Sequence, residues 1–359
     1  MDAPHSERPP LSASSRNGPS TGADEDRVLL AHGEGGRWMR KLIRERIVAR
    51  LDTGWLREMH DAARLPPVEG PLAFTTDSFV VSPLFFPGGD IGSLAVYGTV
   101  NDLAVSGAEP LYLTLSVIIE EGLPFAMLDR ALDSVARAAN RVGIPIVAGD
   151  TKVVPRGAAD GLFLNTAGIG RVIEPGPAGP GSIAPDDVLL VTGPIGRHGM
   201  AVLSAREGLA LEPSPTSDSA PLADAAKALR DRIGTGVRAM RDATRGGVTA
   251  VLHEWAEASG LTLSIDECDV PVSPVVRGAC ELLGIDPLHV ANEGTMVVAV
   301  AAESAAGALD TLRGIPETAG AAIMGRAVRR RGAAVTIRRA LGREQPLDEP
   351  AGAPLPRIC

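Results

Sequence analysis

Residues 72–81 read LAFTTDSFVV, a run of aromatic and β-branched residues that contains a single carboxylate, Asp77. Residues of these types favour extended structure, so we expect a β-strand over this stretch. A carboxylate inside an otherwise apolar strand is costly unless it binds something. The alternative is an acid that faces water from an edge strand. The stretch therefore predicts both a first strand and a candidate ligand.

Helical and extended patterns alternate on both sides of this strand. Apolar spacing predicts helices at 38–51, 94–105, 128–142, 200–207, 220–233, 248–258 and 303–312. It predicts further strands at 111–119, 144–148, 162–172, 188–192 and 295–301. The segment EPGPAGPG, residues 174–181, is typical of a linker. We therefore expect two α+β domains, residues 29–175 and 182–341, between a disordered leader, residues 1–28, and a flexible tail, residues 342–359.

The composition excludes several classes of protein. The 359 residues are 45% hydrophobic and 22% charged, with a net charge of −9, as in a soluble α/β protein without the basic surface of a nucleic-acid binder. Three cysteines are too few for a disulfide framework. Neither a secretory signal nor an apolar run of membrane-spanning length is present. We expect a cytoplasmic protein that binds neither nucleic acid nor membrane.

Acids and glycines gather at the predicted ends of strands and helices, where sites commonly form. HGEGG (32–36) and DATRGG (242–247) each precede a helix, and GDTK (149–152) follows a buried strand. A glycine-rich helix N-terminus suits phosphate, and carboxylates with a lysine suit a magnesium nucleotide. A hinge, a helix cap and a β-turn are the respective alternatives. Together the stretches indicate ATP-dependent phosphoryl transfer, without a Walker A loop or a kinase signature.

The sequence closes with PRIC, residues 356–359, after several prolines. A thiol on such a tail could carry a covalently bound group between sites, whereas a terminal cysteine without a role is the alternative. Eighteen extended residues could span about 60 Å. We interpret the other two cysteines, Cys268 and Cys280, as buried thiols.

Seven segments of the sequence, in their order along the chain, resemble the HypE family, the carbamoyl dehydratases of nickel–iron hydrogenase maturation. They are HGEGG (32–36), TTDSFVVSPLFFPGGDIG (75–92), NDLAVSGAEP (101–110), GDTKVV (149–154), DATRGG (242–247), ANEGT (291–295) and PRIC (356–359). The resemblance implies the two-domain α+β fold of the aminoimidazole ribonucleotide synthetase superfamily. In that fold the N-terminal half forms a β-barrel across a homodimer, and the C-terminal half is an α/β sandwich. ATP and Mg²⁺ are the implied cofactors.

The resemblance also implies a reaction on the chain's own thiol. A carbamoyltransferase partner, HypF, loads a carbamoyl group onto Cys359. ATP-dependent dehydration then converts the S-carboxamide into a thiocyanate, and the cyano group passes to iron held by a HypC–HypD complex. Two rival hypotheses are an ATP-dependent kinase or synthetase for a free small molecule and a non-catalytic scaffold.

Site residues follow from the same resemblance. The implied metal ligands are Asp77, Asp102 and Asp242, with Asp61 and Asp150 next. The implied nucleotide contacts are His32, Gly33, Gly35, Gly36, Thr151, Thr244, Arg245 and Gly246. Lys152 and Glu293 would act beside the carbamoyl group on Cys359. Glu293 would take the amide proton while Lys152 orients or stabilises the intermediate, and the reverse assignment is also open.

Overall fold

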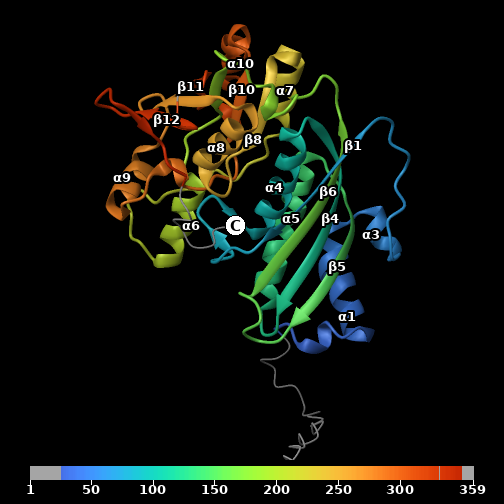
Figure 1. Cartoon of the computed structure of the whole chain (residues 1–359). Helices are drawn as coiled ribbons and strands as arrows, with labels where there is room; N and C mark the ends of the chain where they lie inside the picture. Colours follow the sequence, from blue (N-terminus) through green and yellow to red (C-terminus); the bar gives the residue numbers. More distant parts are fainter. Residues whose placement is uncertain (1–25, 331, 350–359) are drawn as a thin grey trace, which may run out of the picture.

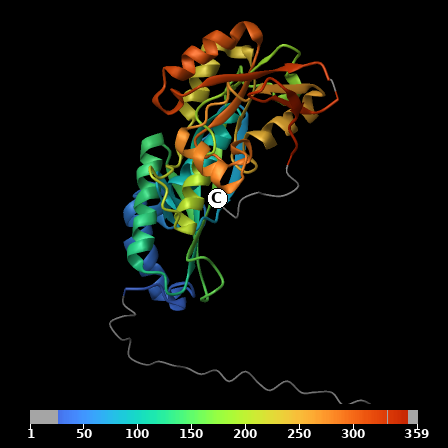
Figure 2. The same ribbon diagram turned by 90° about the vertical axis from the view of Figure 1, so that its left-hand side faces the viewer.

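The computed structural model describes residues 26–330 and 332–349. Its two main β-sheets, one of four strands and one of seven, belong to two domains that stack end to end (Figures 1 and 2). Within the described residues, no helix is long and apolar enough to cross a membrane.

The N-terminal sheet contains, in spatial order, β1 (Leu72–Phe79), β6 (Leu162–Val172), β4 (Ala108–Glu120) and β5 (Ile146–Val154). The pairs β1–β6 and β6–β4 are antiparallel, whereas β4 and β5 are parallel. Helix α5 (Phe125–Val142) makes the crossover that a parallel pair requires. Its apolar face, which includes Leu128, Leu132 and Val135, is fully buried, as the spacing predicts.

Helix α4 (Ile91–Val105) lies at the junction of the two domains. It packs against β1, β6 and α5 of its own domain. It also packs against α7 (Ala223–Ile233) and β8 (Val237–Asp242) of the C-terminal domain. Leu94, Ala95 and Val96 point in different directions around the helix and are all fully buried, because the helix meets protein on every side. The helix therefore carries its polar residues Asn101 and Asp102 into the interface.

The C-terminal sheet has helices on both faces. Its strands run in the order β13 (Glu344–Pro346), β12 (Val335–Arg338), β9 (Thr262–Asp266), β11 (Ala322–Val328), β7 (Val188–Val191), β10 (Met296–Val300) and β8. Helix α8 (Gly247–Ser259) contributes to the core on one face, and α7 and α10 (Ala305–Arg313) to the core on the other. Two further helices, α6 (Arg197–Glu207) and α9 (Pro274–Leu283), pack together beside the N-terminal core.

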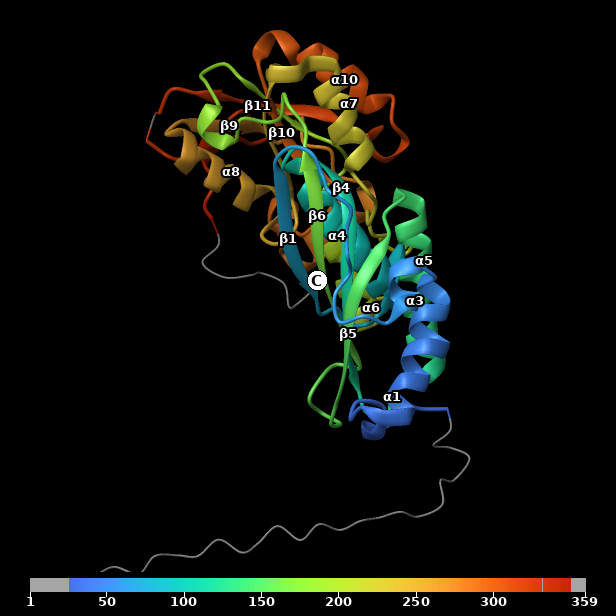
Figure 3. The same cartoon turned by 90° about the vertical axis from the view of Figure 1, so that its right-hand side faces the viewer.

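The N-terminal sheet has one face covered by α4 and α5 and an opposite face that exposes large apolar side chains. Leu72 and Phe74 of β1 are 54% and 70% exposed. Figure 3 looks onto this sheet, with β1 and β5 at its two edges. Exposed aromatic and aliphatic residues on one sheet face are typical of an interaction surface.

Two predicted elements differ from those in the structure. The strand expected at 144–148 extends to Val154, so the GDTK stretch lies within β5 and pairs with β4 instead of forming a turn. Pairing with a neighbouring strand overrides the local turn signal, and Gly149 leaves room for the carbonyl oxygen of Leu115. The helix expected at 38–51 consists of α1 (Gly36–Leu42), a π-helical segment Ile43–Val48, and α2 (Ala49–Leu51).

The ends of the fold also differ from the expected boundaries. Val28, assigned to the leader, is fully buried, and its backbone pairs with that of Leu123. Residues 344–346, assigned to the tail, form β13, and the adjacent Leu347 is buried. An edge strand tolerates Pro346, and the apolar contact of Leu347 stabilises it. Residues 1–25 of the leader and Cys359 lie outside the described residues. Cys280 is buried as expected, but Cys268 is exposed in a turn.

Candidate active site

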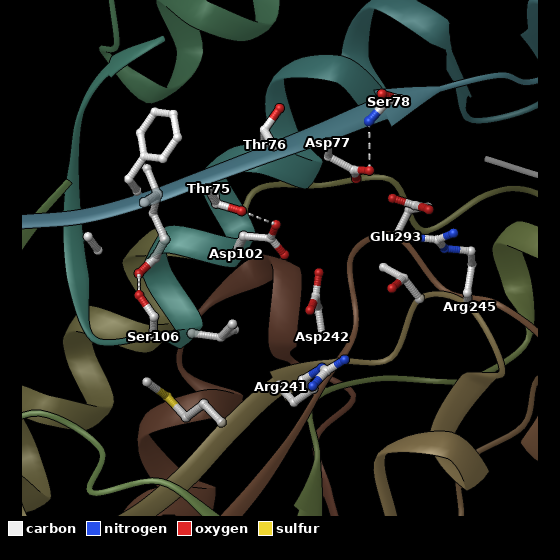
Figure 4. Close-up of a pocket in the computed structure, with 16 residues that line it drawn as sticks. Thr75, Thr76, Asp77, Ser78, Asp102, Ser106, Arg241, Asp242, Arg245 and Glu293 are labelled. Carbon is white, nitrogen blue, oxygen red and sulfur yellow. Dashed lines mark hydrogen bonds between the residues drawn. The ribbon is translucent and has the colours of Figure 1, made fainter. Parts of the chain in front are cut away.

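A pocket of about 620 Å³ opens where the two domains meet. Strand β1, helix α4, strand β8 with the loop after it, and the residues before β10 line it. Four carboxylates from these elements, those of Asp77, Asp102, Asp242 and Glu293, point into a common space (Figure 4). The fold thus assembles acids that are up to 216 positions apart in the sequence, from residue 77 to residue 293.

Strand periodicity explains why the β1 acid faces this pocket. Thr75 and Asp77 lie on the same side of β1 as the buried Phe79, which is the side that α4 covers. The hydroxyl of Thr75 donates to Oδ2 of Asp102 at 2.9 Å, and the backbone N–H of Ser78 donates to Oδ1 of Asp77 at 2.8 Å. These bonds orient two of the four carboxylates.

Burial and mutual repulsion disfavour the charged forms of these acids. Burial raises the pKa of the Asp242 carboxyl to about 7, and the nearby charge of Asp102 adds to the shift. Burial raises the pKa of Glu293 well above its usual range, with Asp242 and Asp218 as the next causes. The pKa values of Asp102 and Asp77 are also raised, chiefly by burial. Protons or a bound cation would therefore lower the electrostatic cost of this cluster of acids.

Two arginines line the same pocket. Arg241 pairs with Glu254 at 2.7 Å, and the charge of Arg245 acts to lower the pKa of Asp77 and of Asp102. Guanidinium groups are well suited to phosphate oxygens. Carboxylates and arginines side by side can thus receive a phosphate group together with a cation.

The donor set fits Mg²⁺ shared with phosphate oxygens. Within residues 26–330 and 332–349, no three His, Cys, Asp or Glu side chains are arranged to hold a metal ion by themselves. Mg²⁺ bound with a nucleotide needs only one or two protein carboxylates. Hard oxygen ligands whose charged forms need a compensating cation therefore suit a magnesium nucleotide better than a resident metal.

The remaining implied site residues lie elsewhere on the chain. Asp150 and Lys152 form an ion pair at 2.8 Å on β5, the opposite edge strand from β1. Three strand spacings, about 14 Å, separate these two edges. Lys152 pairs in register with Ile118 of β4. Side chains alternate between the two faces along a strand, and the neighbouring Val117 faces the core, so Ile118 and Lys152 lie on the face away from α4. One chain therefore does not bring Lys152 to Glu293.

The HGEGG loop packs on β5 at Val153, the residue after Lys152, and does not line the acidic pocket. A Cβ on Gly33 would lie 2.7 Å from Cβ of Val153, so the loop packs directly on β5. His32 is buried, its Nδ1 accepts from the backbone N–H of Leu29 at 2.9 Å, and burial lowers its pKa. This histidine stabilises the loop, whereas Gly35 and Gly36 adopt positive φ angles of 83° and 72°.

Asp61 and Thr151 line a second, smaller pocket that also includes Asp150. This pocket lies between β5 and helices α1 and α3 (Gly54–Glu58), away from the other acids. Thr244 and Arg245 line the acidic pocket, and Gly246, with a φ of 76°, leads from that loop into α8. The implied site thus divides into two groups at opposite edges of one sheet.

Two buried residues with clear structural roles, Asn101 and Asp218, were not predicted from the sequence. The sequence predicts no role for Asn101, although its side chain bonds to the backbone of Glu293 and of Leu222. Asp218 was not noted at all, because an acid between two serines is typical of a solvated loop.

Comparison with known proteins agrees with this fold. Residues 59–172 match the N-terminal domain of AIR synthase related proteins, and residues 184–338 match the C-terminal domain. The chain is 48% identical over 337 residues to carbamoyl dehydratase HypE of Escherichia coli strain K12, covering 92% of this chain and 99% of that protein. The chain belongs to the HypE family. The expected two-domain fold is confirmed.

Solved HypE structures support the same assignment. A crystal structure of the hydrogenase maturation protein HypE in complex with ATP superimposes with a TM-score of 0.88 at 42% identity, covering 92% of this chain and 99% of that one. A HypE–HypF complex matches with a TM-score of 0.76 at 44% identity, covering 86% and 99%. The first relative binds ATP and the second assembles with HypF.

Proposed function

We propose that this chain catalyses the ATP-dependent dehydration of an S-carbamoyl group on Cys359 to a thiocyanate, the source of a cyanide ligand for hydrogenase iron. The observation that carries the proposal is the acidic pocket at the domain junction, in which Glu293 and three aspartates face Arg241 and Arg245. Membership of the HypE family supplies the reaction, and the ATP complex of a relative supplies the nucleotide.

The chemistry requires an amide oxygen to become a leaving group. In the first step that oxygen attacks the γ-phosphorus, ADP departs, and the nitrogen loses one proton. In the second step the C–O bond breaks, phosphate leaves, and the nitrogen loses its other proton as the nitrile forms. Atoms balance because the oxygen of the lost water leaves in phosphate.

We assign the proton transfer to Glu293. This side chain lines the pocket and is 4% exposed, and its raised pKa makes its carboxylate a stronger base than an exposed glutamate. Lys152 is exposed and ion-paired with Asp150, so it suits the orientation or charge stabilisation of the carbamoyl oxygen. Cys359 carries the group throughout.

Asp77, Asp102 and Asp242 are the residues that would hold Mg²⁺ with the phosphates. When bound, the ion would neutralise charge on the transferred phosphoryl group. Arg245 would contact phosphate oxygens, and Thr244 and Gly246 would border the same phosphates. Asp61 and Asp150 lie at the opposite edge of the sheet from these three aspartates and are weaker candidates for this role.

A second copy of the chain would reunite the two groups of residues. If the open faces of two N-terminal sheets meet, Leu72 and Phe74 become buried, and the Lys152 edge of one copy can approach the Asp77 edge of the other. We therefore propose a homodimer with a β-barrel across its interface. In it, Thr151 and the HGEGG loop, including Gly33, would cover the nucleotide held by the partner subunit.

HypF is the proposed carbamoyl donor, because a 44% identical relative assembles with it. A HypC–HypD complex as cyanide acceptor and a cytoplasmic location remain predictions from the resemblance.

Intact-mass measurement tests the proposed function. The carbamoylated full-length chain is incubated with Mg-ATP, and the loss of the mass of one water should map to the Cys359 peptide. The Cys359→Ala variant should take up no carbamoyl group, whereas Cys268→Ala, which removes an exposed thiol, should behave as the unaltered chain. Persistence of the carbamoyl mass would refute the dehydratase. Full activity after removal of Cys359 would favour a free small-molecule substrate, and absence of ATP turnover would favour a scaffold.

A further inference from the structure

Asp218 packs against the loop that carries Glu293. Its side chain is buried, at 8% exposure, and does not line the pocket itself. Its Oδ1 accepts from the backbone N–H of Glu293 at 3.1 Å. Its Oδ2 accepts from the backbone N–H of Gly294 at 3.1 Å and from the hydroxyl of Thr295 at 2.8 Å. One buried carboxylate thus holds three consecutive residues of the loop.

The backbone around this carboxylate is closely packed. A Cβ on Gly294 would overlap the carbonyl oxygen of Asp218, so the two segments touch along their main chains. Asn101 of α4 joins them, because it donates to the carbonyl oxygen of Glu293 at 3.3 Å and accepts from the N–H of Leu222 at 2.7 Å. The loop has little freedom to move relative to α4.

We propose that Asp218 is a positioning residue that aims the Glu293 carboxylate at the bound carbamoyl group. The inference rests on the proposed role of Glu293 as the base. Three hydrogen bonds to one anionic acceptor hold a short loop more firmly than neutral bonds would. A displacement of about 1 Å at a reacting group can slow a reaction by about 100-fold. Asp218 therefore acts on the rate of reaction rather than on nucleotide binding.

Four variants separate positioning from simple packing. Asp218→Asn keeps the shape but replaces one acceptor oxygen by an NH₂ group, so at least one of the three bonds is lost. Thr295→Val removes a hydroxyl that donates to Asp218, whereas Thr295→Ser retains it. Asp224→Asn makes the same chemical change at an exposed position of α7 and serves as the control.

Two quantities are measured on the full-length chain. One is the first-order rate constant for water loss from the carbamoylated thiol at saturating Mg-ATP, and the other is the nucleotide Kd. We expect Asp218→Asn to lower the rate about 10- to 100-fold and Thr295→Val about 3- to 10-fold, with Kd changed less than about twofold. Thr295→Ser and Asp224→Asn should stay within about twofold of the unaltered rate.

An unchanged rate in Asp218→Asn, or equal losses in Thr295→Ser and Thr295→Val, would overturn the inference. So would a rise in nucleotide Kd that accounts for the whole loss. Hydrogen exchange on the uncarbamoylated protein tests the same contact without catalysis, because the amides of Glu293 and Gly294 should exchange faster in Asp218→Asn. Unchanged exchange there would also refute the positioning role. Failure of the unaltered chain to lose water would instead refute the proposed function.

Discussion

At the scale of single residues, the acids of the candidate active site lower the stability of the folded chain when no ligand is bound. Asp242 is 7% exposed and lies among other acids, an arrangement that costs free energy unless a proton or cation compensates it. Glu293 is in the same situation, with Asp242 and Asp218 among the causes of its raised pKa. Such unfavourable charge is expected where a ligand supplies the compensation, as Mg²⁺ with a nucleotide would do here.

The pH dependence of stability tests this account. A carboxyl whose folded pKa is about 7, against an ordinary value of 3.8, favours folding at low pH and loses that contribution as pH rises through 7. Without metal or nucleotide, Asp242→Asn should therefore stabilise the protein at pH 8 by on the order of 1–4 kcal/mol, and by much less at pH 5. Urea unfolding in the presence of a chelator measures both values.

The matched control for Asp242 is Asp310→Asn, which changes an exposed acid of α10. It should alter the free energy of unfolding by less than about 0.5 kcal/mol at either pH. Mg-ATP should stabilise the unaltered protein more than Asp242→Asn. Identical pH profiles for the unaltered protein and Asp242→Asn would contradict the account.

At the scale of elements, edges and termini determine where the functional groups lie. Strand β13 pairs with β12, and Nε2 of His253 in α8 lies 2.9 Å from the carbonyl oxygen of Leu347. His253 lies six residues, or about 9 Å, along α8 from Gly247, where the helix begins. The loop with Arg245 comes directly before this helix, so the attachment of Leu347 lies about 9 Å along α8 from that loop. Cys359 is twelve positions beyond Leu347, enough for about 40 Å when extended, which is shorter than the span expected from an eighteen-residue tail.

Substitution of Leu347 tests this attachment. Because its side chain is 4% exposed, Leu347→Ala should lower the free energy of unfolding by about 2–4 kcal/mol. Leu341→Ala changes the same residue type six positions away, where the side chain is 98% exposed, and should cost less than about 0.5 kcal/mol. Urea unfolding compares the two variants. Equal losses would show that β13 and Leu347 do not stabilise the domain in solution.

At the scale of the whole molecule, one chain holds two incomplete halves of the implied site. Asp77 and Lys152 lie on opposite edges of the four-stranded sheet and on opposite faces. The open face between them exposes Phe74 and Leu72. A symmetric pairing of two such faces would bury these side chains and create two composite sites.

Subunit mixing tests the composite site. Asp77→Asn and Lys152→Ala should each be inactive alone, but random mixed dimers should regain about a quarter of normal activity, since half the dimers are mixed and one of their two sites is intact. Co-refolding followed by the water-loss assay measures this. The control pair, Asp77→Asn with Asp102→Asn, changes the same half of the site and should stay inactive. Equal failure of both mixtures would place the whole site within one chain.

Much of the fold followed from local patterns. The periodicity at Leu128, Leu132 and Val135 correctly predicted α5, and the β-branched run around Asp77 correctly predicted β1. Strands β8 and β11 were not predicted, because their short sequences resemble many loops and their pairing partners are distant in the chain. The strand end expected at Ala148 was wrong for the same reason, since pairing with β4 continues β5 to Val154.

The family, the chemical types of the site residues and most of the helices can be assigned from the amino-acid sequence alone. These depend on residue identity and on spacing within one element. Which of those residues lie together is visible only in the folded chain. In the fold, Asp77, Asp102, Asp242 and Glu293 line one pocket, whereas Lys152 lies at the far edge of the sheet. Asp218 is hydrogen-bonded to the loop that carries Glu293. Contacts between distant segments depend on how sheets and helices pack, and local sequence patterns do not encode that packing.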